Sequence, residues 1–185
     1  MTADPTQVAA VVALVAVARP ECGAALVVAI DGHSGAGKTT LATAVADGLR
    51  APLVHLDGLY PGWDGLAAGV RRLTELVLQP FCRGEPAVYR LWDWHRDGWG
   101  QAVTVPWAPV LVVEGCGCTA RPADAYAAVR VWVEAGAGVR RRRALARDGA
   151  AYEPHWQRWA DQEEALFACD RTRERAHLVL DTSSA

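Results

Sequence analysis

The sequence predicts an α/β fold in which helices cover both faces of a parallel sheet, the doubly wound arrangement. Two observations lead to this prediction. Along the 185 residues, short apolar runs alternate with segments of helical periodicity, as they do in parallel β-α-β units. A glycine-rich loop lies between the first strand-like run and the helix that follows it. The candidate strands are residues 26–31, 52–57, 110–115, 129–134 and 177–181.

The first element is an expected helix around the apolar segment Val8 to Ala18. Pro5 lies near its first turn and Arg19-Pro20 follows its end, as is typical of helix boundaries. No basic residue precedes the segment, and it is too short to span a bilayer, so we expect neither a signal peptide nor a membrane anchor. We therefore expect this helix to pack against the sheet.

Periodicity also predicts the other helices. Apolar residues at positions 66, 70, 73 and 77 give residues 63–78 a helical spacing. Residues 83–107 are irregular and rich in Trp and Arg, and we expect a hairpin there, with strands near 88–94 and 101–105. The remaining helices are expected at residues 38–48, 139–147 and 152–173.

Length and composition predict one domain, residues 1–185, that is large enough to bury a core. Hydrophobic residues make up 51% of the chain and the formal net charge is −2. These values argue against a disordered chain and give no basic excess for binding nucleic acid. The expected partner is a small molecule rather than a nucleic acid or a membrane, and a homo-oligomer is left open.

The five cysteines are odd in number and scattered along the chain. One glycine separates Cys116 from Cys118, which is too tight for the usual zinc pair, and no second pair complements them. We therefore expect reduced, mostly buried thiols and a cytoplasmic protein. The cysteines are Cys22, Cys82, Cys116, Cys118 and Cys169.

Residues 32–39, Gly-His-Ser-Gly-Ala-Gly-Lys-Thr, fit the P-loop pattern G-x-x-x-x-G-K-[ST] without a mismatch. The glycines let the backbone N–H groups turn inward and form an anion site for a β-phosphate. Lys38, the single lysine among 19 Lys and Arg residues, is expected to reach the β- and γ-phosphates, and the Thr39 hydroxyl to bind Mg²⁺. The expected nucleotide contacts are Gly32, His33, Ser34, Gly35, Ala36, Gly37, Lys38, Thr39 and Thr40.

Two acids end strand-like runs. Asp57 follows the second run and Glu114 ends the third, at the sheet edge where open α/β folds bind ligands. We assign Glu114 to Mg²⁺, through water, and Asp57 to orienting an acceptor hydroxyl as its base. Each acid alone could be an ordinary exposed strand end, but two acids on the edge that carries a P-loop favour the catalytic interpretation.

A basic helix supplies further candidates. Arg140, Arg143 and Arg147 are three and four positions apart and so share one helical face. Over a triphosphate such a face would be neutralised and would stabilise transition-state charge. A solvated helix face is the alternative.

Residues 92–96, Trp-Asp-Trp-His-Arg, mix aromatic rings with donors and acceptors. Such a mixture suits a pocket that stacks a planar ring and binds its edge. A tryptophan-rich hydrophobic cover with His95 packed at its rim is an equal alternative. The candidate substrate contacts here are Trp92, Asp93, His95 and Arg96.

Together these motifs resemble, in the same order, the uridine kinase family of P-loop kinases, the group that also holds phosphoribulokinase. The resemblance covers about residues 25–148, and only the first motif is highly specific. The matching segments are Ile30-Asp-Gly-His-Ser-Gly-Ala-Gly-Lys-Thr-Thr-Leu-Ala42, Asp57-Gly-Leu-Tyr60, Trp92-Asp-Trp94, Val113-Glu-Gly115, and Arg140-Arg-Arg-Arg143 to Arg147-Asp148.

The resemblance implies a P-loop NTPase fold with a five-stranded parallel sheet and a mobile lid, and ATP-dependent phosphorylation of a small-molecule hydroxyl. The lid and acceptor-binding segments would span roughly residues 60–105 and 140–160. By the same resemblance, Asp57 acts as the base, Tyr60 matches a substrate-site tyrosine, and Trp92 lies against a nucleobase. The lid arginines would contact phosphates.

The sequence departs from the family at the acceptor side. Gly58 and Leu59 replace the usual Ser-Phe, and the segment from Tyr60 to the next helix is shorter than in uridine kinases. Asp64 could stand in for the ribose-binding acid. Residues 152–168 do not follow the family pattern after the lid, so the acceptor stays open.

Three functions remain open. The first is a small-molecule kinase, with a uridine- or cytidine-like nucleoside as the leading acceptor. The second is a nucleoside-monophosphate or other phosphate-acceptor kinase, and the third is a non-catalytic ATP-binding protein. A GTPase switch is disfavoured because the chain has no Asn-Lys-x-Asp motif. The second function would need extra arginines, for which Arg71, Arg72, Arg90 and Arg96 are candidates.

Overall fold

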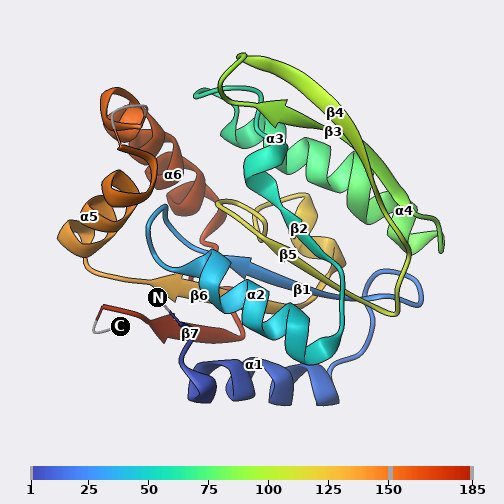
Figure 1. Cartoon of the computed structure of the whole chain (residues 1–185). Coiled ribbons are helices and arrows are strands. Elements are labelled where there is room, and N and C mark those ends of the chain that lie inside the picture. Colours follow the sequence, from blue (N-terminus) through green and yellow to red (C-terminus); the bar gives the residue numbers. More distant parts are fainter. Residues whose placement is uncertain (1, 150–151, 184–185) are drawn as a thin grey trace.

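The computed structural model describes residues 2–149 and 152–183, and it confirms the predicted fold class. Its main sheet has five strands in the order β2-β5-β1-β6-β7, and every neighbouring pair is parallel (Figure 1). Strand β1 therefore lies at the centre, between β5 and β6. The strands are β1 (Leu26–Asp31), β2 (Leu53–His55), β5 (Val110–Glu114), β6 (Ala127–Glu134) and β7 (Leu178–Asp181).

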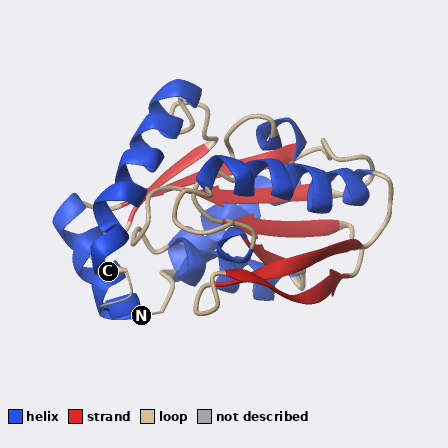
Figure 2. Cartoon of the chain, turned by 90° about the horizontal axis from the view of Figure 1, so that it is seen from above, coloured by secondary structure: helices blue, strands red, loops and turns tan. Residues whose placement is uncertain are grey.

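Helices cover both faces of this sheet (Figures 1 and 2). On one face, α1 (Pro5–Val17) and α2 (Lys38–Leu49) enclose a core with the β1 and β6 side chains Val28, Ile30 and Val131. The opposite face is covered by α3 (Leu66–Leu73), α4 (Gln79–Cys82) and α6 (Trp156–Asp170). The doubly wound prediction is therefore confirmed.

Several element boundaries differ from the expected ones. The helix expected at residues 63–78 begins at Leu66 and continues through a π-helical segment, Thr74–Leu78, into α4. The helix expected at residues 152–173 is a short 3₁₀ turn, Glu153–His155, followed by α6. Pro154 favours a helix start at this turn, and α6 ends where Arg171 adopts a left-handed conformation.

The irregular tryptophan-rich stretch forms an antiparallel hairpin of β3 (Ala87–Asp93) and β4 (Gly98–Val105). It forms a separate two-stranded sheet next to α3 and α4 (Figure 1). Helix α5 (Ala137–Asp148) follows β6 and begins at the carboxyl edge of the main sheet. The first helix, α1, is capped by Asp4, whose carboxylate accepts a hydrogen bond from Thr6 N–H at 2.8 Å.

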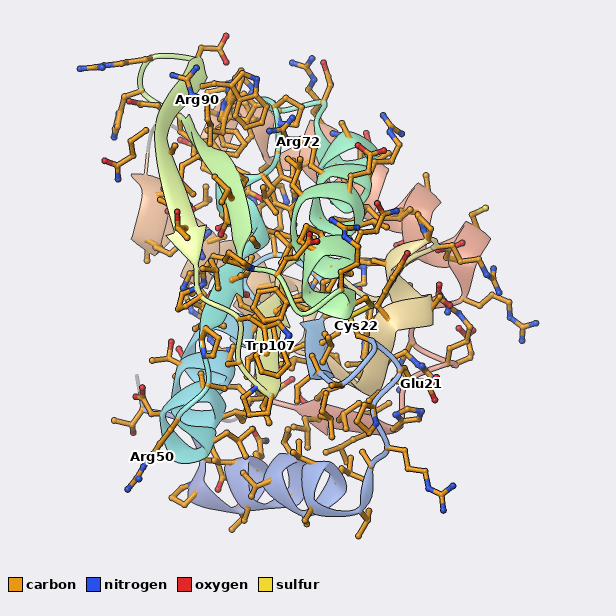
Figure 3. The ribbon with its side chains drawn as sticks, turned by 90° about the vertical axis from the view of Figure 1, so that its right-hand side faces the viewer. Glu21, Cys22, Arg50, Arg72, Arg90 and Trp107 are labelled. Atoms are coloured by element: carbon orange, nitrogen blue, oxygen red, sulfur yellow. A yellow bond between two sulfur atoms is a disulfide. The ribbon has the colours of Figure 1, made fainter. Side chains whose placement is uncertain are left out.

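Two of the five cysteines are paired, which corrects the expectation that all are reduced. Cys22 and Cys82 form a disulfide. They are 60 positions apart in sequence, and the packing of the segment before β1 against the end of α4 brings their Cα atoms to 4.5 Å. Figure 3 labels Cys22 in this segment. Cys116 and Cys118 are buried free thiols and Cys169 is exposed. Among the described residues, no helix has the length and apolar character needed to cross a membrane.

Asp31, at the end of β1, connects the P-loop to the segment after β5. The side chain is fully buried, and Oδ1 accepts hydrogen bonds from the N–H groups of Gly32 and Gly117, both at 2.7 Å. Oδ2 accepts from Thr119 N–H at 2.8 Å and from its hydroxyl at 2.7 Å. Burial raises the pKa of Asp31, while these four hydrogen bonds oppose the rise. The carboxylate thus fixes the entry of the P-loop.

We expect Asp31→Asn to lower the free energy of unfolding by about 2–4 kcal/mol, because an amide NH₂ would face donors that now meet an oxygen. Urea denaturation of the two proteins measures the difference. The matched control is Asp47→Asn on the exposed side of α2, which should change stability by less than about 0.5 kcal/mol. Equal loss in both variants would contradict a special role for Asp31.

Candidate active site

A cleft of about 1220 Å³ opens at the carboxyl ends of the central strands. It is lined by the P-loop, by residues at the ends of β2 and β5, by the hairpin tip, and by residues of α5 and α6. Most of the predicted site residues meet here. Those that line the cleft are Ser34, Gly35, Gly37, Lys38, Thr39, Thr40, Asp57, Tyr60, His95, Glu114, Arg143 and Arg147.

The P-loop has a backbone that requires glycine. Gly35 and Gly37 have φ angles of 77° and 95°, which L side chains rarely adopt. A Cβ atom on Gly32 would lie 2.0 Å from the Val133 carbonyl oxygen. Gly37 caps α2 without a side-chain hydrogen bond, so the N–H groups of the first helical turn have no intrahelical partner and can bind an anion.

His33 and Ala36 belong to the loop but do not line the cleft. The His33 ring packs edge-on against Trp132 and Phe167, with centroids 5.5 and 4.9 Å apart. Burial, together with the positive charges of Arg140 and Lys38, lowers the pKa of His33 to about 4, so its ring is neutral at pH 7.

Lys38 lies at the base of the cleft. Its ammonium group donates to the His33 carbonyl at 3.0 Å and to Cys116 Sγ at 3.3 Å. Burial lowers the pKa of Lys38, but the nearby Cys116 sulfur and the carboxylates of Glu114 and Glu163 outweigh this effect and raise the pKa overall. Lys38 therefore stays charged at the position where phosphates would bind.

Thr39 and Glu114 meet as the sequence predicts. The Thr39 hydroxyl donates to Glu114 Oε1 at 3.1 Å. His55 Nδ1 lies 2.6 Å from the same oxygen, and this hydrogen bond raises the pKa of His55. The contact with His55 was not predicted from the sequence.

Asp57 lies in the 3₁₀ turn Leu56–Gly58 that follows β2. Asp57 is exposed and lines the cleft, and desolvation by the surrounding protein together with the charge of Glu114 raises its pKa above the ordinary 3.8. Trp94 Nε1 donates to the Asp57 carbonyl at 2.9 Å and fixes the turn. A carboxylate with a raised pKa is a stronger proton acceptor.

Arg143 and Arg147 reach the cleft, whereas Arg140 does not line it. Arg143 donates to Thr182 Oγ1 and O at 3.1 and 2.8 Å. Arg147 bonds Asp148 at 2.7 Å, and this contact raises the pKa of Arg147. Arg140 is in the first turn of α5, where its Nε donates to the Ala135 carbonyl at 3.2 Å and holds the side chain at the helix base.

The hairpin places Trp94 and His95 in the cleft, but not Trp92, Asp93 or Arg96. Trp92 is still within β3 and packs edge-on against Trp99, with centroids 4.9 Å apart. Trp94 follows the last residue of β3, so the turn rather than the strand directs its ring. Asp93 Oδ1 accepts the N–H groups of His95 and Arg96 at 3.0 and 3.1 Å and shapes this turn.

Four aromatic residues that line the cleft were not predicted from the sequence: Trp63, Tyr152, His155 and Trp159. The Trp63 ring stacks on His155 with centroids 4.4 Å apart and on Tyr152 at 5.3 Å, and Trp159 lies edge-on to Tyr60 at 4.9 Å. These rings come from segments before α3 and after α5, which the sequence separates by about ninety residues. Tyr152, His155 and Trp159 belong to residues 152–168, the segment that departs from the uridine kinase pattern, and no individual role was assigned to these three residues.

The remaining candidates lie elsewhere. Asp64 pairs with Arg158 on α6. Arg72 stacks on Trp99 of the hairpin, 3.7 Å from the ring centroid, and Arg90 on β3 donates to the Gly100 carbonyl of β4 at 2.8 Å (Figure 3). Within the part of the chain that the structure describes, none of Arg71, Arg72, Arg90 and Arg96 lines the cleft.

Comparison with known proteins agrees with this geometry. A cytidylate kinase from Pyrobaculum arsenaticum is 30% identical over 166 residues, which cover 85% of this chain and 84% of that protein. The chain belongs to the P-loop kinases. No protein-family model matches the sequence.

Solved structures show that this P-loop kinase has the uridine kinase-like fold. A possible uridine kinase from Bacillus stearothermophilus superposes with a TM-score of 0.69 at 17% identity, over 95% of this chain and 98% of that one. A shikimate kinase from Acinetobacter baumannii gives 0.55 at 17% identity, over 87% and 86%.

The kinase has oxygen ligands suited to Mg²⁺. Among the described residues, no group of three or more His, Cys, Asp or Glu side chains could hold a metal by itself. Mg²⁺ is usually held by one or two protein oxygens together with substrate phosphates and water, and the adjacent Thr39 hydroxyl and Glu114 carboxylate supply such a pair. These residues would hold the ion beside the P-loop.

We expect Thr39→Val to remove most of the gain in ATP affinity that Mg²⁺ provides, roughly tenfold, because the isosteric side chain lacks the hydroxyl ligand. Calorimetric titration with ATP, with and without Mg²⁺, measures this gain. Thr39→Ser keeps the hydroxyl and should retain it. An undiminished gain in the valine variant would exclude Thr39 as a ligand.

Proposed function

We propose that this P-loop kinase transfers the γ-phosphoryl group of ATP to a hydroxyl group of a small molecule, with a uridine- or cytidine-like nucleoside as the leading acceptor. The observation that carries the proposal is the position of Asp57 in the same cleft as Lys38 and Thr39. A carboxylate of raised pKa beside a phosphate-binding loop is suited to accept a proton from an acceptor hydroxyl.

In the proposed reaction the acceptor oxygen forms a bond to the γ-phosphorus as the bond to the ADP oxygen breaks. Asp57 takes the hydroxyl proton. Lys38 and the P-loop N–H groups hold the phosphates, and Arg143 and Arg147 approach from α5 to stabilise charge on the transferring group. Mg²⁺, when bound, would neutralise charge on the β- and γ-phosphates.

The aromatic walls support a planar acceptor. Trp63, Trp94, Tyr152 and Trp159 all line the cleft, and aromatic faces stack well on a flat ring. His95 lies at the same wall and can donate to or accept from the edge of such a ring. A short aliphatic acid would leave these rings largely unused.

A phosphate acceptor is the second candidate, because the relative from Pyrobaculum arsenaticum is a cytidylate kinase. The arrangement of the arginines disfavours it, since the four that could hold a second phosphate lie outside the cleft. A non-catalytic ATP-binding protein is the third candidate.

We further propose a cytoplasmic location and a small-molecule partner, with no role for nucleic acid or membrane. The disulfide between Cys22 and Cys82 argues against this location, because disulfides are uncommon in cytoplasmic proteins.

We expect Lys38→Ala to reduce turnover by at least about 100-fold, because a charged donor to the transferring group is lost. The assay follows Mg²⁺-dependent ATP consumption with uridine, cytidine, other hydroxyl acceptors and nucleoside monophosphates. Circular dichroism checks that the variant is folded. Equal turnover in the variant would contradict the P-loop assignment, and silence of the wild type with every acceptor, despite ATP binding, would favour the non-catalytic candidate.

We expect Asp57→Asn to lower kcat by roughly 10²–10⁴-fold while ATP affinity stays nearly unchanged. In the wild type the active form is the carboxylate, so activity should fall as the pH falls through the raised pKa of Asp57, and the variant should lose this limb. Steady-state kinetics against pH measures both effects. Full activity of the variant would instead indicate a phosphate acceptor, which needs no base.

A further inference from the structure

An acid that has no part in the proposed reaction lies directly behind the P-loop. Glu163 is on α6, and only 1% of its surface is exposed. Its Oε1 atom accepts three hydrogen bonds, from Ser34 N–H at 2.7 Å, from Trp159 Nε1 at 2.9 Å and from the Cys116 thiol at 3.0 Å. This one oxygen atom thus contacts the P-loop at Ser34, the aromatic lining of the cleft at Trp159, and the segment after β5 at Cys116.

A buried carboxylate is costly unless donors or a positive charge compensate it. Burial raises the pKa of Glu163, while the charge of Lys38 and the three hydrogen bonds oppose the rise and favour the carboxylate. Lys38 Nζ donates to Cys116 Sγ at 3.3 Å, while the Cys116 thiol donates to Glu163. Cys116 therefore bridges the ammonium group and the carboxylate in one buried chain of hydrogen bonds.

Ser34 is held from two directions. Glu163 binds its N–H group, and the Tyr152 hydroxyl donates to its Oγ at 3.0 Å. The next residue, Gly35, packs so tightly against α5 that an added Cβ would lie 2.2 Å from the Arg140 carbonyl oxygen. The shape of the P-loop thus depends on side chains and backbone that follow β6, more than one hundred residues later in the sequence.

We propose that Glu163 is a positioning residue that preforms the nucleotide site, by fixing Ser34 through its N–H group and Lys38 through Cys116. This inference rests on the proposed function only in taking ATP as the ligand. If the loop were not held in this shape, ATP would have to order it on binding, and the apparent affinity would fall by the fraction of molecules in the competent shape.

The substitution Glu163→Gln has two effects on ATP affinity, and they have opposite signs. Glu163→Gln keeps the size and one acceptor oxygen of the side chain but removes its charge, so the hydrogen bonds to Ser34 and Cys116 weaken. The same change removes a negative charge near the bound phosphates, which by electrostatics alone would tighten ATP binding. Weaker binding therefore reports the loss of positioning.

We expect Glu163→Gln to raise the Kd for ATP by about 10- to 100-fold, as for loss of a hydrogen bond to a charged group. Isothermal titration calorimetry with Mg²⁺-ATP, without acceptor, measures binding apart from turnover. The matched control is Asp161→Asn, an exposed acid on the same helix whose carboxylate accepts from Gln157, and its Kd should stay within about twofold.

The outcomes separate the two hypotheses. A wild type that does not bind ATP contradicts the proposed function itself. A wild type that binds ATP and a folded Glu163→Gln variant that binds it equally or more tightly overturn the positioning role. Thermal unfolding checks the fold of the variant. If it does not fold, Cys116→Ala replaces it: this variant removes the bridge from Glu163 to Lys38, and an unchanged Kd there overturns the positioning of Lys38 through Cys116.

Discussion

The parallel pairing of β1 with β5 is the constraint on which the site depends. Its register places Ile30 opposite Glu114, so the two strands end together and the P-loop that leaves β1 lies beside the acid that ends β5. The Asp31 carboxylate then accepts four hydrogen bonds, one from Gly32 after β1 and three from Gly117 and Thr119 after β5. Because the backbone is fixed on both sides, the Thr39 hydroxyl and the Glu114 carboxylate meet within hydrogen-bond distance.

Charge balance is the second organising feature. Lys38 is almost buried, and a buried ammonium group is tolerated only near compensating groups. Here those groups are Glu114 in front of it and Glu163 behind it, the latter through Cys116. Burial raises the pKa of Asp57, and the charge of Glu114 in the same cleft raises it further.

The acceptor wall is assembled from distant segments. Trp63 precedes α3, Trp94 follows β3, and Tyr152 and Trp159 follow α5, yet their rings form one surface of the cleft. The Asp64–Arg158 ion pair and the hydrogen bond from Gln162 to the Trp63 carbonyl, 2.7 Å long, join two of these segments. The shape of this wall therefore depends on contacts between segments far apart in the sequence.

The sequence by itself determined the fold class, the approximate strand positions and the P-loop pattern, because these follow from local periodicity and from a motif whose residues are close in the chain. Glu114, 75 positions from Thr39, was singled out only because it ends a strand-like run. Tertiary structure alone decided that Trp94 rather than Trp92 lines the cleft, that Arg140 does not line it, that Cys22 pairs with Cys82, and that Glu163 contacts the P-loop. Glu163 interrupts a stripe of apolar side chains on α6, between Trp159 and Phe167, and this was the only trace of its role in the sequence. These features depend on which side chains meet across the folded chain, and no local pattern carries that information.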